Sequence, residues 1–388
     1  MIEDEKQDGS VDFPVGDKAY IFDAMAILQT LTVLPATFGE LATDLLAKIV
    51  NTAVSLNFSR VDFVCDRHPE KSIKNLERDK RAMGGTNVIR IYSEQQRVPR
   101  QWKKFMASGE NKEEIMKFIF NTWRNADSQA LKGVEVFLAH EDKCHKLTEL
   151  LGDMSCTEIE ELSCDHEEAD TRMIAHARHA SLSYSNVIVK SPDTDVFLIA
   201  LNAINDIIAN LFFETGKGNA TRIISLNKTK QHIGEQWCSS LIGFHAFTGC
   251  DTTSAFYGKG KVKALKIART NDEYAILFGN LGKTVTLSTQ LKNGLYGFVC
   301  HLYGYEGRSD VNSVRYEMFK GGKYDEELLP PNQDSLDNHI RRANYQCYIW
   351  RHAVQPILRL PDFCDHGWKL DEEGNVTINW MSQLFHTS

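Results

Sequence analysis

Short apolar segments that end in an aspartate recur along this chain and limit the folds that it can adopt. Residues 19–22 are predicted to form a buried strand that Asp23 follows, and a second apolar strand is followed by Asp66. Residues 186–189 form a third strand, and a Ser-Pro turn separates it from Asp193. In open parallel α/β sheets, ligand sites form outside the carboxyl ends of the strands. The sequence therefore predicts an α/β fold with a mostly parallel central sheet flanked by helices.

Four carboxylates lie close together in the middle of the chain. Glu168 and Asp170 open a predicted helix, and Asp193 and Asp195 follow the strand at residues 186–189 with the same i, i+2 spacing. Carboxylates that share a site repel one another unless cations or hydrogen bonds hold them. Mg²⁺ binds through a few carboxylates together with water and substrate phosphate. The pattern predicts a metal site for phosphodiester chemistry.

Each acidic pair also has a purely structural interpretation. Asp165 could be the N-cap of a helix with Glu168 at position N3, which is the spacing of a capping box. Asp193 and Asp195 could serve as a turn and a helix cap. The metal interpretation is favoured because both pairs occur together, separated by one helix and one strand.

A basic stretch follows Asp66. Lys71, Lys74, Arg78 and Arg81 have spacings that place them on one face of a helix. A basic helix can bind a phosphate backbone, and the alternative is a solvated amphipathic helix. Its place directly after Asp66 favours contact with nucleic acid.

A second acidic and glycine-rich segment lies further along the chain. Asp251 follows Gly-Cys, and Gly258, Lys259, Gly260 and Lys261 then open a helix. Bare backbone amides at a helix N-terminus suit a phosphate group or, through nearby carbonyls, a bound cation. The Gly-Lys-Gly motif is a common loop and is weak evidence by itself.

The secondary structure between these motifs follows from periodicity. The pattern predicts helices at residues 38–56, 141–151, 196–211 and 336–354, and a β-hairpin at residues 212–226.

We divide the chain into three parts. Residues 1–18 form a flexible acidic tail, residues 19–270 form the main domain, and residues 271–388 form a mostly helical C-terminal cap. Within the main domain, residues 67–130 form a basic arch-like insertion and residues 241–268 a helix–hairpin–helix element.

Composition adds few constraints. The formal charge of −8 does not exclude nucleic-acid binding, because a carboxylate site is itself acidic and local charge decides phosphate contact. The nine cysteines include no C-x-x-C pair, which favours a reducing compartment over a zinc module or a disulfide framework. No long apolar run or secretory signal is present, so we expect an intracellular protein with no membrane partner, nuclear rather than cytoplasmic.

The order of the motifs resembles the flap endonuclease / xeroderma pigmentosum G superfamily of structure-specific 5′ nucleases, a branch of the PIN-like fold. The two segments Glu-Glu-Ala-Asp-Thr-Arg-Met and Ser-Pro-Asp-Thr-Asp-Val also resemble segments of animal proteins associated with mobile elements. The resemblance implies two groups of metal ligands for Mg²⁺ or Mn²⁺, with Asp23 joining the first through water. The first group comprises Asp66, Glu168 and Asp170, and the second comprises Asp193, Asp195 and Asp251.

The resemblance also implies the substrate contacts. Lys71 and Arg78 match the family's basic pair at the scissile phosphate, and Gly258 and Gly260 match a hairpin that grips the DNA backbone with a monovalent cation such as K⁺. The chain departs from the family pattern at Arg67, where a glycine is common, and at Lys261, where a proline is common. These departures concern substrate preference more than metal binding.

The function expected from the sequence is hydrolysis of phosphodiester bonds of DNA or RNA by a two-metal mechanism. DNA that is branched or has a free 5′ end is the expected partner. One alternative is a catalytically silent nucleic-acid-binding scaffold of the same fold. Another is a different Mg²⁺ or Mn²⁺ enzyme that uses Asp193 and Asp195, either a sugar transferase or a phosphatase.

Overall fold

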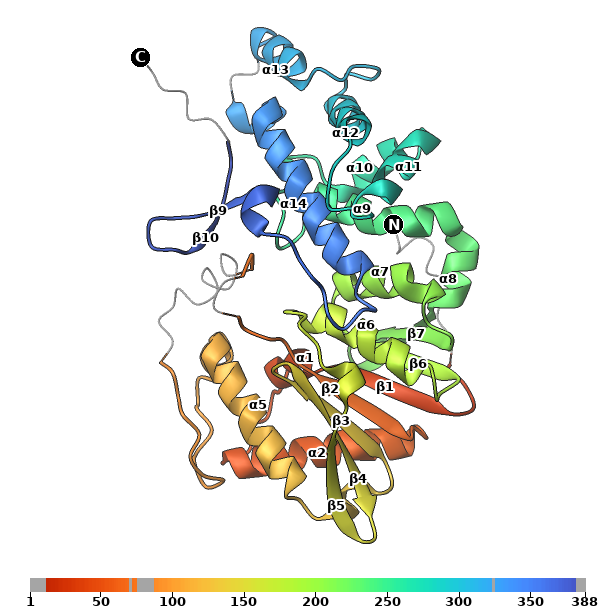
Figure 1. Ribbon diagram of the computed structural model, residues 1–388, viewed down its shortest axis with the longest axis vertical. Helices are drawn as coiled ribbons and strands as arrows, with labels where there is room; N and C mark the ends of the chain where they lie inside the picture. The colour runs from red at the N-terminus through yellow and green to blue at the C-terminus, as the bar shows by residue number, and fades with distance from the viewer. Residues whose placement is uncertain (1–11, 70–71, 75–86, 323–324, 382–388) are drawn as a thin grey trace.

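The structure is a computed structural model that describes residues 12–69, 72–74, 87–322 and 325–381 (Figure 1). In this part of the chain a central sheet lies between two layers of helices. No helix in it has both the length and the apolar character needed to cross a membrane.

The central sheet has eight strands in the order β5-β4-β3-β2-β1-β6-β7-β8. The five strands from β3 to β7 in this order run parallel, and β4, β5 and β8 are antiparallel to their neighbours. The predicted mostly parallel sheet is therefore confirmed. The strands are β1 (Lys18–Asp23), β2 (Arg60–Val64), β3 (Glu135–His140), β4 (Lys143–Leu150), β5 (Asp153–Glu158), β6 (Asn186–Lys190), β7 (Asn210–Thr215) and β8 (Arg222–Ser225).

The central strands are apolar because helices cover both faces of the sheet. In β1, Ala19 and Ile21 pack into one core and Tyr20 and Phe22 into the other. The second core is covered by four helices, α1 (Ala24–Gln29), α2 (Phe38–Ser55), α4 (Trp102–Phe105) and α5 (Gly109–Arg124).

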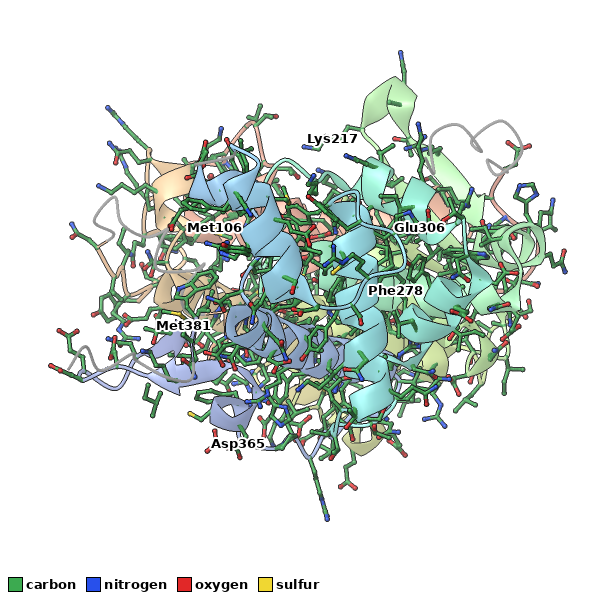
Figure 2. All side chains as sticks on the ribbon, turned by 90° about the horizontal axis from the view of Figure 1, so that it is seen from above. Met106, Lys217, Phe278, Glu306, Asp365 and Met381 are labelled. Atoms are coloured by element: carbon green, nitrogen blue, oxygen red, sulfur yellow. The ribbon has the colours of Figure 1, made fainter. Side chains whose placement is uncertain are left out.

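The larger helical layer packs on the opposite face and includes the C-terminal helices. Figure 2 shows Phe278 in the interior of this layer, where the side chain is fully buried. One continuous core thus joins the sheet to the C-terminal segment. The helices are α6 (Ala169–Ala180), α7 (Thr194–Asn202), α8 (Leu226–Ile233), α9 (Glu235–Thr248), α10 (Lys261–Ala268), α11 (Asp272–Asn280), α12 (Thr289–Leu302), α13 (Val311–Lys320) and α14 (Gln333–Arg351), and a hairpin of β9 (Trp368–Leu370) and β10 (Val376–Ile378) packs beside α14.

Several predicted elements are confirmed. The helix predicted at residues 38–56 is α2, which begins with a capping box between Thr37 and Glu40. The helix predicted at residues 336–354 is α14, and the predicted hairpin is the antiparallel pair β7–β8.

Two helix predictions were wrong. Residues 141–151 contain strand β4, which pairs with β3 and β5, because a tight turn at Glu141 (φ 50°) folds the chain back onto β3. The helix predicted at residues 196–211 ends at Asn202, and Asn210 already belongs to β7, where pairing with β6 decides the conformation. In both segments sheet pairing with distant residues outweighs the local pattern.

The chain changes direction across the sheet at β1. Strand β1 pairs with β2 on one side and with β6 on the other, with Asp23 opposite Val64 and Phe22 opposite Lys190. The carboxyl ends of these three strands therefore meet at one edge. This is the switch point at which α/β sheets form their sites.

Candidate metal centre

Six of the seven predicted acidic ligands line one cavity at the switch point. The cavity has a volume of about 560 Å³ and also includes Lys74, Lys103 and Lys112 in its wall. The fold thus brings together residues that are far apart in sequence, as the sequence predicts. The six acids are Asp23, Asp66, Glu168, Asp170, Asp193 and Asp251.

Three of these carboxylates, those of Asp23, Asp66 and Asp193, accept hydrogen bonds from backbone amides at helix N-termini. Asp23 Oδ1 accepts a hydrogen bond from the Ala26 amide at 2.9 Å, and Asp193 Oδ1 accepts one from the Asp195 amide at 2.9 Å. The capping interpretation of Asp193 is therefore correct, and Asp193 lines the cavity as well. A cap fixes the carboxylate in place at the edge of the cavity.

The capping box expected from Asp165 and Glu168 is not formed. Glu168 itself is the N-cap residue of α6 and makes no side-chain cap, while Asp165 Oδ1 accepts a hydrogen bond from the Leu358 amide at 2.8 Å. The α6 N-terminus is capped from another element instead, because Asp66 Oδ1 accepts from the Ala169 amide at 2.8 Å.

Buried side chains that the sequence does not flag hold α6 in place. Arg172 is fully buried and donates to the carbonyls of Glu141 and Lys143 at 2.7 Å each. His176 Nδ1 lies 2.7 Å from Asp62 Oδ2, which ties the same helix to β2. Glu168 and Asp170 at the start of α6 are therefore carried by a helix with fixed position.

The anchor at Asp62 is an ion pair inside the protein. Burial opposes ionisation of Asp62, but a bidentate Arg60 guanidinium at 2.7 Å outweighs it and lowers the pKa of Asp62 to about 2. Burial also lowers the pKa of His176 to about 4, so this histidine is neutral at pH 7. The Arg60 guanidinium also lies over the Phe137 ring at 3.7 Å.

Three of the cavity carboxylates have raised pKa values, as expected when several acids share a buried site. Burial, followed by the charges of Asp66 and Asp193, raises the pKa of Asp23 to about 7. Burial also raises the pKa of Asp170 well above its usual value. The charge of Lys74 lowers this pKa, and the neighbouring acids raise it further. Desolvation likewise raises the pKa of Asp193. Nearby cations would favour the ionised forms.

Lys74 supplies one such cation. Its ammonium group forms an ion pair with Oε1 of Glu168, whose side chain is nearly buried. Oε2 of Glu168 is buried, and none of the described residues donates a hydrogen bond to it. An unsatisfied buried carboxylate oxygen is suited to a cation, and oxygen donors of this type are those that Mg²⁺ and Mn²⁺ take.

The described residues do not form a finished metal site. Among them, no three Asp, Glu, His or Cys side chains converge as the ligands of one ion. The donor chemistry fits a divalent cation, while in this conformation Lys74 lies against the acid that has the unsatisfied oxygen.

Asp195 differs from the other six acids because it is not among the residues that line the cavity. Its Oδ1 lies 2.7 Å from Nε2 of His245 on α9, and Nδ1 of His245 lies 2.7 Å from the Lys261 ammonium group. Burial alone would raise the pKa of Asp195, but the His245 hydrogen bond lowers it below its usual value. Burial lowers the pKa of Lys261 to about 8. No sequence motif points to His245.

Of the predicted basic face, Lys74 is the member that the structure describes, and it lines the acidic cavity. Lys71, Arg78 and Arg81 lie outside the described residues, so the structure does not place the rest of the predicted basic face. Lys103 and Lys112 line the acidic cavity, which brings two further cations to it.

The glycine turn between α9 and α10 has the backbone shape that its sequence requires. Gly258 has φ 65°, which glycine adopts without strain. The Lys259 ammonium group lies over the Tyr303 ring at 4.3 Å from its centroid, and Gly260 is the N-cap residue of α10. Lys261 starts that helix, and its side chain turns inward toward His245.

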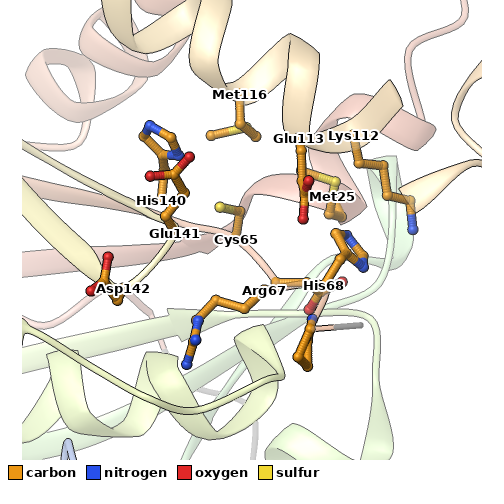
Figure 3. A pocket seen from close by; sticks show the side chains of 12 residues that line it. Met25, Cys65, Arg67, His68, Lys112, Glu113, Met116, His140, Glu141 and Asp142 are labelled. Atoms are coloured by element: carbon orange, nitrogen blue, oxygen red, sulfur yellow. The ribbon is translucent and has the colours of Figure 1, made fainter. Parts of the chain in front are cut away.

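A smaller cavity of about 200 Å³ opens beside the acidic one and shares Asp66 and His68 with it (Figure 3). Cys65 lies in its wall, but burial raises the pKa of this thiol to about 12 and Sγ donates to the Ala139 carbonyl. A thiol with this pKa does not act as a nucleophile at neutral pH.

The comparisons with known proteins give structural matches only. No family model and no curated protein matches the sequence. The similar solved structures include the bacteriophage T5 flap endonuclease in a pseudo-enzyme–product complex with DNA and metal ions, at 12% identity and a TM-score of 0.41, covering 88% of this chain and 92% of that chain. The phage protein crystallised with metal ions matches at 13% identity and a TM-score of 0.39, with the same coverage. The catalytic core of Rad2 in complex with DNA substrate matches at 11% identity and a TM-score of 0.35, covering 81% of this chain and 90% of that chain.

These similarities are low, so the function has to be argued from the residues of the site.

Proposed function

We propose that this chain is a metal-dependent nuclease that hydrolyses phosphodiester bonds of DNA. The proposal depends mainly on one observation, the six carboxylates that line a single cavity at the switch point of the sheet. Burial, together with neighbouring carboxylates, raises the pKa values of Asp23, Asp170 and Asp193, which supports a site in which several acids are held together. Such an arrangement lowers stability unless cations bind it, which gives a metal function physical support.

Bound Mg²⁺ or Mn²⁺ would activate water and offset the charge of the scissile phosphate and leaving oxygen. Glu168 and Asp170 on α6 and Asp193 on α7 are the residues that we propose as principal ligands. Asp66 and Asp23 hold their carboxylates at the carboxyl ends of β2 and β1. We propose that two ions bind, because six acids in one cavity are enough to supply ligands for two.

The cations of the cavity wall would attract the phosphate backbone. Lys103 and Lys112 lie in the same wall as the acids, so a phosphodiester that reaches the carboxylates also reaches positive charge. Lys71 and Arg78 remain our proposed contacts to the scissile phosphate on the basis of their sequence positions. A substrate with a free 5′ end or a branch is proposed on the resemblance to flap endonucleases.

A phosphatase with Asp193 as a nucleophile is less well supported. Enzymes of that type place the first aspartate straight after a strand, but β6 ends at Lys190 and Asp193 caps α7. A silent scaffold of the same fold remains the second candidate. Its weakness is that nothing about scaffolding accounts for six acids in one cavity.

The test is cleavage of end-labelled 5′-flap DNA, single-stranded DNA and plain duplex, with Mg²⁺ or with EDTA. The variants Asp193→Asn and Glu168→Gln remove charge, and asparagine keeps the α7 cap because it is as good an N-cap as aspartate. Asp44→Asn, on the exposed face of α2, is a control on an acid that lines neither cavity.

Mg²⁺-dependent cleavage that both variants lose and the control keeps would support the proposal. Binding of DNA without cleavage would favour the scaffold, and full activity of either variant would contradict the site. Cleavage of RNA alone would retain the site and change the substrate class.

A further inference from the structure

We infer that His245 and Lys261 are positioning residues that hold Asp195 as a metal ligand, so that Lys261 acts inside the protein and not on the DNA backbone. The inference rests on the proposed function, and it adds Asp195 to the metal ligands proposed there. It depends on a chain of hydrogen bonds that runs from α10 through α9 to α7.

The direction of these hydrogen bonds follows from the chemistry of the groups. An ammonium group only donates, and that of Lys261 lies 2.7 Å from Nδ1 of His245 and 3.4 Å from Nε2, so Nδ1 is the nearer acceptor. With Nδ1 as the acceptor, Nε2 is the ring nitrogen that donates to Asp195 Oδ1 at 2.7 Å. Lys261 therefore selects the tautomer of His245 that can hold the Asp195 carboxylate.

The position of both side chains supports a role inside the fold. The His245 side chain is 13% exposed and that of Asp195 is 15% exposed. Lys261 also donates to the His245 carbonyl oxygen at 3.2 Å, which satisfies a carbonyl in the last turn of α9. A lysine with these two partners is held in one orientation, unlike a lysine that reaches for phosphate from a loop.

The consequence for metal binding is geometric. Asp195 does not line the acidic cavity in this conformation. It lies in the first turn of α7, two residues after Asp193, which does line the cavity. Because Oδ1 is held by His245, Oδ2 is the oxygen that we propose as the metal ligand. Partners that orient a metal-binding carboxylate typically change metal affinity about 10- to 100-fold when they are removed.

The experiment measures Mn²⁺ binding without DNA, from the electron paramagnetic resonance signal of free Mn²⁺. We expect His245→Leu and Lys261→Met to weaken Mn²⁺ binding by about tenfold or more. His245→Gln should restore much of the affinity, because the glutamine amide can donate to Asp195 in place of Nε2. Lys259→Met is the matched control, since this neighbouring lysine lies over Tyr303, and it should leave Mn²⁺ affinity unchanged.

A second arm measures binding of duplex DNA in EDTA. Lys261→Met should bind DNA as the wild type does. Unchanged Mn²⁺ affinity together with weakened DNA binding in Lys261→Met would overturn the inference and make Lys261 a backbone contact. If the wild type binds Mn²⁺ and all variants bind it equally, the inference fails while the proposed function stands. If the wild type binds no Mn²⁺, both fail.

A measurement on the unaltered protein keeps the inference testable if a variant does not fold. Nitrogen chemical shifts of the His245 ring report which nitrogen carries the proton. The inference requires the Nε2–H tautomer at neutral pH, and the Nδ1–H tautomer would overturn it.

Discussion

Asp66 joins two elements that are far apart in the sequence, because its Oδ1 accepts a hydrogen bond from the amide of Ala169 at 2.8 Å. The carboxylate that follows β2 thereby caps the helix that begins with Glu168 and Asp170. One residue thus serves both the fold and the proposed metal site.

This relationship predicts different effects for two substitutions. Asp66→Ala removes the cap and should lower the free energy of unfolding by about 1 kcal/mol, whereas Asp66→Asn keeps an acceptor and should lower it much less. Both variants lose the charge and should bind Mn²⁺ more weakly. Urea unfolding in EDTA and Mn²⁺ titration measure the two properties separately. Equal losses of stability in both variants would show that the Ala169 contact is unimportant.

Lys74 is predicted to stabilise the metal-free protein. Lys74→Met leaves the nearly buried Glu168 carboxylate without its ion pair, which should cost about 2 kcal/mol in EDTA. Saturating Mg²⁺ should narrow this deficit, because a divalent cation can replace the ammonium charge. Lys103→Met, in the same cavity wall, is the control and should change stability little. The same loss with and without Mg²⁺ would contradict this role.

The raised pKa of Asp23 predicts a pH-dependent stability difference. In the folded protein this pKa is about 7, whereas in the unfolded chain it is about 3.9, so only the folded state keeps the proton between these values. The stabilisation is complete below about pH 3.9 and is lost as the pH rises through 7, at up to about 1.4 kcal/mol per pH unit for one proton.

Asp23→Asn should therefore be more stable than the wild type at pH 8 in EDTA, and the difference should shrink toward pH 4.5. Buried histidines such as His176, with a pKa near 4, add the opposite slope to both proteins, so the difference between them is the informative quantity. Urea unfolding at pH 4.5, 6 and 8 measures it, with Asp44→Asn on the exposed face of α2 as a control. A difference that does not vary with pH would refute the assignment.

The anchor between α6 and β2 predicts a structural effect. His176→Ala removes a hydrogen-bond partner of the fully buried Asp62 carboxylate and should cost about 2 kcal/mol. His179→Ala is a milder change on the same helix, because His179 contacts only the Arg60 end of the network at 2.9 Å. Urea unfolding of the two variants should rank them in this order, and the reverse order would place the anchor elsewhere.

Much of the fold was predictable because its signals are local. Apolar strands followed by Asp23, Asp66 and Asp193 predict parallel strands with acids at one edge, and the structure confirms both. The capping box of Thr37 and Glu40 marks the start of α2 in the same local way.

Other features depend on distant partners and have no local signal. Strand β4 forms because β3 and β5 pair with it, and the sequence around Thr148 also fits a helix. His245 and His176 are single residues outside any motif, and Arg172 lies in the Glu-Glu-Ala-Asp-Thr-Arg-Met segment without any signal for its structural role. Their roles arise only when α6 packs against β2 and the β3–β4 turn and α9 packs against α7, so no spacing in the sequence could reveal them.

The central claim is that the cavity carboxylates hold divalent cations, and anomalous diffraction from crystals grown with Mn²⁺ tests it most directly. The account predicts an anomalous peak within coordination distance of Glu168 and Asp170, and a second beside Asp193. Crystals with Mn²⁺ bound elsewhere and no peak in this cavity would contradict the account.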